Sequence, residues 1–264
     1  MEKPKIFVVY NEKYTMESAQ ALAGLFNCDC GTESQPCDIL IRWGNSYDKG
    51  EGRLFDVNFK KGIRRLSTNR KGLPYEIERV KSRFMNDEEM YIVHKKYHMN
   101  GVGHLIVFGF QRDLVRDLEF KFINKFIKSK KEYRLIVDRY GNSLWQEKRW
   151  LGEWDNPANL LIRTGANGWK YEYVSFKDDE VLNKMKDYIK ELDLVVASFD
   201  IIYDLEGKPH CVEGNSSPCL SNAKSANFVF KAFKKYIKER LDECNTNDES
   251  GSSAQEKSME SSGV

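Results

Sequence analysis

Acidic residues interrupt two apolar, strand-forming runs in the last third of the sequence. Asp200 lies within Ala197-Ser-Phe-Asp-Ile-Ile202, and Glu213 follows Val212 in the run that ends at Asn215. An ionised carboxylate inside a buried strand needs a partner, because burying an unpaired charge is very costly. The pattern therefore requires a β-structure that brings partners to these acids.

The segment between the two runs, Asp204-Leu-Glu-Gly-Lys208, predicts a turn and hence an antiparallel hairpin. Because side chains alternate along a strand, Glu213 and Asn215 share a face, and the hairpin can bring Asp200 opposite them. Two carboxylates and an amide oxygen form the all-oxygen ligand set that Mg²⁺ prefers when it also binds waters and substrate phosphates. We expect a metal site at these three residues. The alternative is a surface hairpin with solvated acids.

The N-terminal part reads as a small βαβ unit. An apolar run at residues 5–10, a helical pattern at 15–26 and a second apolar run at 38–43 predict a strand, a helix and a strand of a parallel sheet. Residues 58–70 have helical periodicity with many basic residues, and residues 75–84 are also predicted to form an amphipathic helix.

The middle of the chain changes to a β-meander. Strands are expected at 89–97 and 103–110, at 119–127, at 132–140 and at 143–150, and the last two flank Gly141-Asn142, a hairpin signal. A short extended segment at 171–176, a helix at 179–192 and a closing helix at about 221–241 complete the expected folded part. Mixed strand orders of this kind indicate an α+β (mixed α/β) fold.

Two groups of basic residues accompany these strands. Lys95 and Lys96 precede a loop containing Asn100, Gly101 and Gly103, whose backbone N–H groups can approach a phosphate. The loop matches neither a Walker motif nor a dinucleotide-binding fingerprint, and glycines also suit a plain hairpin turn.

The second basic group is Lys148-Arg149, on the strand that follows Gly141-Asn142. These residues are either surface charges or cations that neutralise phosphate near the acidic hairpin.

The charge is unevenly distributed along the chain. The total is +2, and residues 242–264 carry six acids and one base, which leaves +7 on residues 1–241. The tail 242–264 lacks the apolar residues that offset ordering entropy, so we expect it to be disordered. The basic body favours a small anion such as a nucleotide, and a nucleic-acid partner is not supported.

No apolar run approaches the roughly 20 residues of a membrane-spanning helix, so no membrane partner is expected. The six cysteines lack the spacing of a zinc site, which favours free thiols in a reducing, cytoplasmic compartment.

The order of these elements resembles the ATP-grasp superfamily, and most of all a compact carboxylate-amine ligase branch with many viral or bacterial members. The similarity covers roughly residues 36–230. The pieces that carry it are Ile41-Arg-Trp-Gly-Asn45, Val57-Asn58, Ser67-Thr-Asn-Arg70, Val93-His-Lys-Lys96 with the loop 98–103, Glu132-Tyr-Arg134, Gln146-Glu-Lys-Arg149, Asn167-Gly-Trp169, Ala197-Ser-Phe-Asp200 and Glu213-Gly-Asn-Ser-Ser-Pro218.

The resemblance implies a division into an N-terminal pre-ATP-grasp region at 1–74, a small lobe at 75–128, a large lobe with the metal site at 129–241, and the tail. It implies that Asp200, Glu213 and Asn215 hold Mg²⁺ on the phosphates of ATP. It further implies that Lys95 or Lys96 contacts the α-phosphate and that the loop from His98 to Gly103, with Asn100 and Gly101, covers the triphosphate.

The resemblance also implies that adenine is bound by the backbone of the hinge, which consists of Lys125, Phe126, Ile127 and Lys128. Lys148 or Arg149 stabilises the transferred phosphoryl group, and Arg134 is a further phosphate or substrate contact. The implied cofactors are ATP and Mg²⁺.

The implied reaction activates a carboxylate as an acyl phosphate, which an amine of a small molecule or peptide then attacks, releasing phosphate after ADP. Such a reaction needs positioning and charge neutralisation rather than a protein nucleophile. Two alternatives remain at this level: a catalytically silent nucleotide-binding interaction module, with the acidic tail as a docking segment, and a small-molecule kinase on the same fold. The substrates and the oligomeric state stay open.

Overall fold

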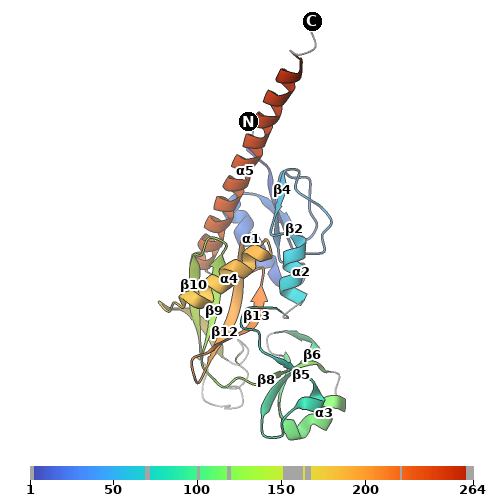
Figure 1. The fold of residues 1–264 in the computed structure, drawn as a ribbon, viewed down its shortest axis with the longest axis vertical. Coiled ribbons are helices and arrows are strands. Elements are labelled where there is room, and N and C mark those ends of the chain that lie inside the picture. Colours follow the sequence, from blue (N-terminus) through green and yellow to red (C-terminus); the bar gives the residue numbers. More distant parts are fainter. Residues whose placement is uncertain are drawn as a thin grey trace.

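The computed structural model describes the chain apart from residues 1–2, 69–71, 100–101, 118–119, 151–162, 164–167, 221 and 260–264. It contains three sheets that follow one another along the sequence (Figure 1). No helix in the described ranges has the length and apolar character needed to cross a membrane.

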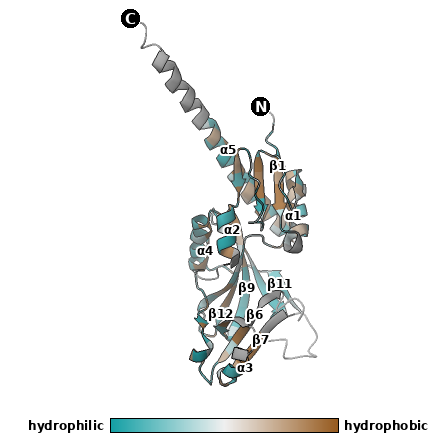
Figure 2. Cartoon of the chain, turned by 90° about the vertical axis from the view of Figure 1, so that its right-hand side faces the viewer, coloured by the Kyte–Doolittle hydropathy of each residue, from teal (hydrophilic) through white to brown (hydrophobic). Residues whose placement is uncertain are grey.

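The N-terminal sheet is four-stranded and parallel, with the order β2-β1-β3-β4. Its elements are β1 (Ile6–Tyr10), α1 (Glu12–Phe26), β2 (Asp29–Gly31), β3 (Ile39–Trp43), β4 (Phe55–Val57) and the following α2 (Lys60–Thr68). The predicted βαβ unit is therefore confirmed. All five residues of β3 are buried, and Figure 2 shows the hydrophobic character of β1 beside it.

The small sheet has the order β5-β8-β6-β7 and is antiparallel throughout. Its elements are β5 (Arg79–Val80), η1 (Ser82–Phe84), β6 (Met90–Met99), β7 (Val102–Phe108), η2 (Gly109–Gln111), α3 (Arg112–Asp117) and β8 (Phe120–Lys125). The expected pairing of the strands on either side of the glycine loop is confirmed, since β6 and β7 form a hairpin.

The helix predicted for residues 75–84 is wrong. This segment contains only the short strand β5 and the single turn η1. Instead, Arg79 and Val80 pair with Asn124 and Ile123 of β8, and the side-chain Nδ2 of Asn124 donates to the carbonyl oxygens of Ile77 and Glu78 at 3.1 and 3.2 Å. Tyr75 also has a φ of +59°, which no α-helix accepts.

The central sheet is five-stranded and antiparallel, with the order β11-β10-β9-β12-β13. Its strands are β9 (Ser129–Asp138), β10 (Ser143–Trp150), β11 (Trp169–Tyr173), β12 (Val196–Asp204) and β13 (Pro209–Asn215), and α4 (Asp179–Glu191) lies between β11 and β12 in sequence. The hairpins predicted at Gly141-Asn142 and at residues 204–208 are both present.

One face of the central sheet packs on α4. Leu135, Phe199 and Ile201 from the sheet join Met185 and Ile189 from the helix in a core of fully buried side chains. Because side chains alternate, the residues between these apolar ones face the other side of the sheet.

Helix α5 (Ala223–Met259) begins against the N-terminal sheet, where Val229 and Phe233 are buried, and then projects away from the body (Figure 1). The structure thus differs from the disorder expected for residues 242–264, of which 260–264 are not described. A helix that is already nucleated by packing extends at little cost, since each further residue adds a hydrogen bond.

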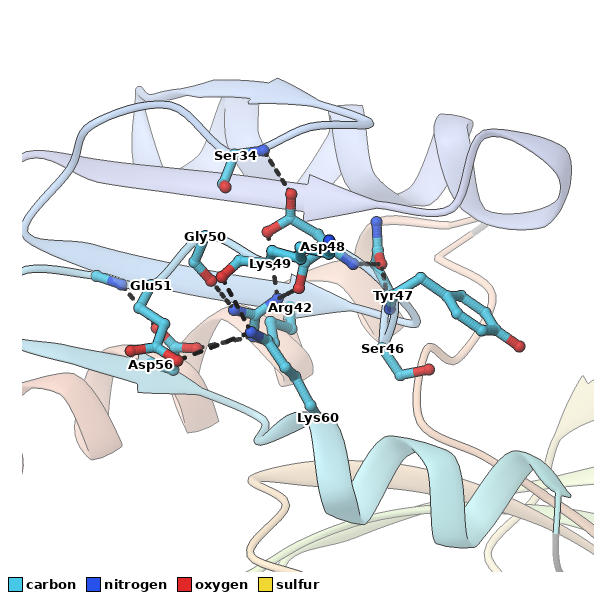
Figure 3. A network of polar contacts seen from close by, with 12 residues as sticks. Ser34, Arg42, Ser46, Tyr47, Asp48, Lys49, Gly50, Glu51, Asp56 and Lys60 are labelled. Atoms are coloured by element: carbon cyan, nitrogen blue, oxygen red, sulfur yellow. Dashed lines mark hydrogen bonds and ion pairs between the residues drawn. The ribbon is translucent and has the colours of Figure 1, made fainter.

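A buried arginine organises the loop after β3 (Figure 3). The Arg42 side chain is fully buried; its Nε donates to Asp56 at 2.8 Å, its Nη1 donates to Asp48 at 3.4 Å, and its Nη2 donates to the Gly50 carbonyl. Asp48 in turn accepts from the Ser34 backbone N–H at 3.0 Å. One guanidinium therefore joins β3, β4 and the connecting loop.

Replacement of this arginine tests how much of the N-terminal region depends on it. Arg42→Met leaves two buried carboxylates without their cation, so we expect the free energy of unfolding to fall by about 3–5 kcal/mol. Arg53→Met is the matched control, because Arg53 pairs with Asp38 but is 79% exposed. We expect the urea concentration at the unfolding midpoint to fall strongly for Arg42→Met and hardly at all for the control. Equal midpoints would contradict the stabilising role of Arg42.

Candidate functional site

Polar side chains from neighbouring strands line the face of the central sheet opposite α4. The pairing of β9, β12 and β13 sets Arg134 opposite Asp200, and Asp200 opposite Glu213. Glu132 precedes Arg134 by two residues on β9, so it has the same orientation. We call Glu132, Arg134, Lys148, Tyr171, Asp200 and Glu213 the polar face.

The centre of the polar face is a bidentate ion pair. Arg134 Nε and Nη2 donate to the two carboxylate oxygens of Asp200 at 2.7 and 2.8 Å. Only 8% of the Asp200 side chain is exposed. Burial would raise the pKa of this carboxyl, but the Arg134 guanidinium holds the pKa below its usual value. Asp200 is therefore ionised at neutral pH, as a metal ligand must be.

A second ion pair lies beside the first. Lys148 Nζ on β10 donates to Glu132 Oε1, and both side chains are about nine-tenths buried. Burial and the nearby Asp200 charge raise the pKa of Glu132, although Lys148 opposes the shift. Two cations and two carboxylates thus lie close together on the neighbouring strands β10, β9 and β12.

Tyr171 on β11 contacts both pairs. Its hydroxyl donates to Asp200 Oδ2 at 3.0 Å, the Arg134 guanidinium carbon lies 4.2 Å from its ring centroid, and Lys148 Nζ lies 5.2 Å from it. Burial, followed by the Asp200 charge, raises the pKa of this phenol, so it remains a donor at neutral pH.

The end of β13 supplies the remaining predicted metal ligands. Asn215 Nδ2 donates to Glu213 Oε1 at 3.2 Å. Burial acts to lower the pKa of Arg134, but the charge and hydrogen bonds of Asp200 raise it above its usual value, with a smaller contribution from Glu213. Carboxylate and amide oxygens at one end of a hairpin are chemically suited to Mg²⁺. In the part of the chain that is described, no three His, Cys, Asp or Glu side chains gather as a metal group.

Helix α2 and the loop after β3 lie against this end of the hairpin. A Cβ placed on Gly214 would lie 2.6 Å from Leu66 Cδ1, and a Cβ on Gly44 would lie 2.6 Å from Ser217 Oγ. A side chain at either position would force its neighbour to shift, and Gly44 also has a φ of +70°, which favours glycine. The N-terminal region thereby fixes the segment that carries Glu213 and Asn215.

No protein-family sequence model matches the chain, and no curated protein matches it by sequence. Solved structures do match. D-alanine–D-alanine ligase from Bacillus anthracis, complexed with ATP, aligns with a TM-score of 0.61 and 14% identity over 94% of this chain and 100% of its own. The chain has the ATP-grasp fold.

Two further ATP-grasp structures are similar. A RiPP-associated ATP-grasp ligase from Chryseobacterium gregarium, in complex with ADP and with a leader and core peptide, has a TM-score of 0.61 and 10% identity over 89% of this chain and 97% of its own. N5-carboxyaminoimidazole synthetase from Staphylococcus aureus, complexed with ADP, has a TM-score of 0.53 and 12% identity over 86% and 74%. The mixed α/β architecture expected from the sequence is therefore confirmed.

In this ATP-grasp fold the predicted hinge lies between two sheets. Lys125 ends β8 in the small sheet, the Phe126 backbone N–H donates to the Met90 carbonyl at 2.9 Å, and Ile127 leads into β9 of the central sheet. The Lys125 ammonium pairs with Glu89.

The predicted phosphate-binding segment of the small lobe is only partly described. Lys95, Lys96 and His98 belong to β6 and Gly103 to β7, but the structure describes only their backbone. Asn100 and Gly101 lie outside the described residues. These predictions stay predictions.

Arg149 is not brought to the polar face. It follows Lys148 on β10 and therefore points to the opposite side, where it pairs with Glu147 at 2.8 Å and Glu172 at 3.1 Å. Of the two neighbouring cations, only Lys148 lies beside Arg134 and Asp200.

The cysteines do not form an alternative site among the described residues. None of the six forms a disulfide bond in the described structure, and Cys219 is exposed. Burial, followed by neighbouring charges, raises the pKa of Cys28 to about 12. A thiol with such a pKa is a poor nucleophile and a poor metal ligand at neutral pH.

Two members of the polar face, Glu132 and Tyr171, are not among the site residues predicted from the sequence. Glu132 has a signal, because its alternation with Arg134 places both on one face of a predicted strand. Tyr171 had no such signal, because nothing in the sequence shows that β11 pairs with β10.

The Arg134–Asp200 pair can be tested by a double-mutant cycle. Arg134→Met leaves a buried carboxylate without its cation, so we expect the free energy of unfolding to fall by about 3 kcal/mol. In the Asp200→Asn background the same replacement should cost at least about 1 kcal/mol less, because the charge that needed a partner is gone. Urea unfolding of the four proteins measures this; strictly additive effects would mean that the pair contributes nothing.

Proposed function

We propose that the chain is an ATP- and Mg²⁺-dependent ligase that joins a carboxylate to an amine. The observation that carries the proposal is the polar face, on which two partly buried cations, Arg134 and Lys148, are each paired with a carboxylate within an ATP-grasp fold. The similar structures named above include ligases complexed with ATP or ADP and one that holds a peptide, which supports a nucleotide and an amino acid or peptide as substrates.

Asp200, Glu213 and Asn215 are proposed to hold Mg²⁺. When bound, this ion neutralises phosphate charge and orients the terminal phosphoryl group. The Asp200 carboxylate is already ionised and oriented before a metal ion binds, because Arg134 and Tyr171 donate hydrogen bonds to its two oxygens. Such support of a ligand by neighbouring side chains is what fixes its geometry.

Lys148 and Arg134 are proposed to bind the phosphate oxygens of ATP. Each of these cations already binds a carboxylate. A phosphate that takes the place of this carboxylate is another anion, so neither cation is left unpaired. Glu132 then keeps Lys148 positioned before the nucleotide arrives. Arg149, on the opposite side of β10, has no part in this proposal.

The remaining contacts are proposed from the resemblance and from the position of the hinge. The backbone of Lys125, Phe126 and Ile127 binds adenine where the small sheet joins the central one. Lys95 or Lys96 binds the α-phosphate, and the loop from His98 to Gly103 closes over the triphosphate.

The proposed reaction has two steps. A substrate carboxylate oxygen attacks the γ-phosphorus, the bond to the β-phosphate oxygen breaks, and an acyl phosphate and ADP form. An amine then attacks the acyl carbon, the carbon–oxygen bond to phosphate breaks, and the amine loses a proton as the amide and free phosphate form. The chain's own groups position reactants and neutralise charge, which is the main requirement of phosphoryl transfer.

Calorimetric titration with ADP in the presence and absence of Mg²⁺ tests the nucleotide site. We expect Mg²⁺ to tighten binding, and we expect Asp200→Asn and Glu213→Gln each to weaken Mg²⁺-dependent binding by about tenfold or more, equivalent to about 1.4 kcal/mol. Glu206→Gln is the matched control, since it removes the same charge from the exposed turn of the same hairpin.

Turnover is then tested with ATP, Mg²⁺ and panels of amino acids and peptides, by following ADP and the mass of the product. An amide together with free phosphate supports the proposed ligase. Nucleotide binding without any ADP release would identify a silent module, and a phosphorylated product would identify a kinase. No nucleotide binding at millimolar concentration would contradict all three.

A further inference from the structure

Tyr171 is the one side chain of the polar face that contacts the metal-ligand carboxylate and both cations. Its hydroxyl is 3.0 Å from Asp200 Oδ2, and its ring lies 4.2 Å from the Arg134 guanidinium carbon and 5.2 Å from Lys148 Nζ. It comes from β11, one of the two edge strands of the central sheet, and its register partner on β10 is Lys148.

The surroundings of Tyr171 differ from those of a tyrosine that fills a core. None of the hydrophobic clusters in the described part of the chain includes it. Tyr203, on β12, gives the contrast: its ring is in edge contact with Phe176 and Tyr133 on the apolar face, and its hydroxyl donates to Asp178 at 2.8 Å. Both tyrosines therefore donate to an aspartate, but only Tyr171 has charged groups around its ring.

The aromatic ring offers the cations a contact that an incoming anion does not displace. If phosphate oxygens take Arg134 and Lys148 from Asp200 and Glu132, the ion pairs are exchanged, whereas the attraction of each cation to the ring persists. The hydroxyl likewise keeps one oxygen of Asp200 oriented after the guanidinium has turned to a phosphate.

We propose that Tyr171 is a positioning residue that holds Asp200 through its hydroxyl and spaces Arg134 and Lys148 through its ring. This rests on the proposed function, because it assigns Tyr171 to the same nucleotide site. The two parts of the side chain have separable roles: the hydroxyl acts on the metal ligand, and the ring acts on the phosphate-binding cations.

The test compares Tyr171→Phe, which keeps the ring, with Tyr171→Leu, which removes it, by calorimetric titration with ADP over a range of Mg²⁺ concentrations. For Tyr171→Phe we expect a rise of about tenfold in the Mg²⁺ concentration at which ADP binding is half-maximally tightened. The affinity for ADP without Mg²⁺, measured in EDTA, should be unchanged. For Tyr171→Leu we expect, in addition, a loss of about fivefold or more in the affinity measured in EDTA.

Tyr203→Phe is the matched control, since it removes the same kind of hydrogen bond from the opposite face of the sheet. It should change thermal stability without changing either binding parameter. The role of Tyr171 is refuted if wild-type protein binds ADP with Mg²⁺ and both Tyr171→Phe and Tyr171→Leu bind it equally well. It is also refuted if all three variants lose stability but keep wild-type binding. In both cases the proposed nucleotide site is unaffected. If wild-type protein binds no ADP, the proposed function itself fails.

Discussion

The ion pair between Arg134 and Asp200 is the interaction on which the rest of the site depends. Asp200 is buried in the middle of a sheet, where an unpaired carboxylate would take up a proton rather than remain charged. The bidentate contact keeps it ionised and fixes both oxygens. Lys148, Glu132 and Tyr171 extend this contact into a network in which each charge has a neighbour of opposite sign.

The rest of the fold keeps this network in register. Leu66 of α2 lies against Gly214, between the two predicted ligands of β13, and Gly44 after β3 lies against Ser217. Asn58, in a left-handed conformation, accepts a hydrogen bond from the Val195 backbone N–H at 2.8 Å at the start of β12. Contacts from α2, Gly44 and Asn58 therefore support the strands that carry the site.

The features that could be predicted from the sequence are those set by residues close together in the chain. Alternation and the turn at residues 204–208 are enough to place Asp200 opposite Glu213, since both depend on neighbours in the chain. The partner of Asp200 on its other side, Arg134, lies 66 residues away on β9, and Tyr171 reaches the site only because β11 pairs with β10. Residues 75–84 follow the same logic: their helical periodicity is overridden by pairing with β8, which no local pattern reveals.

The two carboxylates of the hairpin, Asp200 and Glu213, are proposed to form the metal end of a nucleotide site. A crystal structure of the protein with Mn²⁺ and a non-hydrolysable ATP analogue, with the metal located by its anomalous scattering, tests this most directly. We expect a metal peak within coordination distance of Asp200 and Glu213 and of phosphate oxygens, with Lys148 turned toward the phosphates. A nucleotide bound elsewhere, or a metal that contacts neither carboxylate, would contradict it.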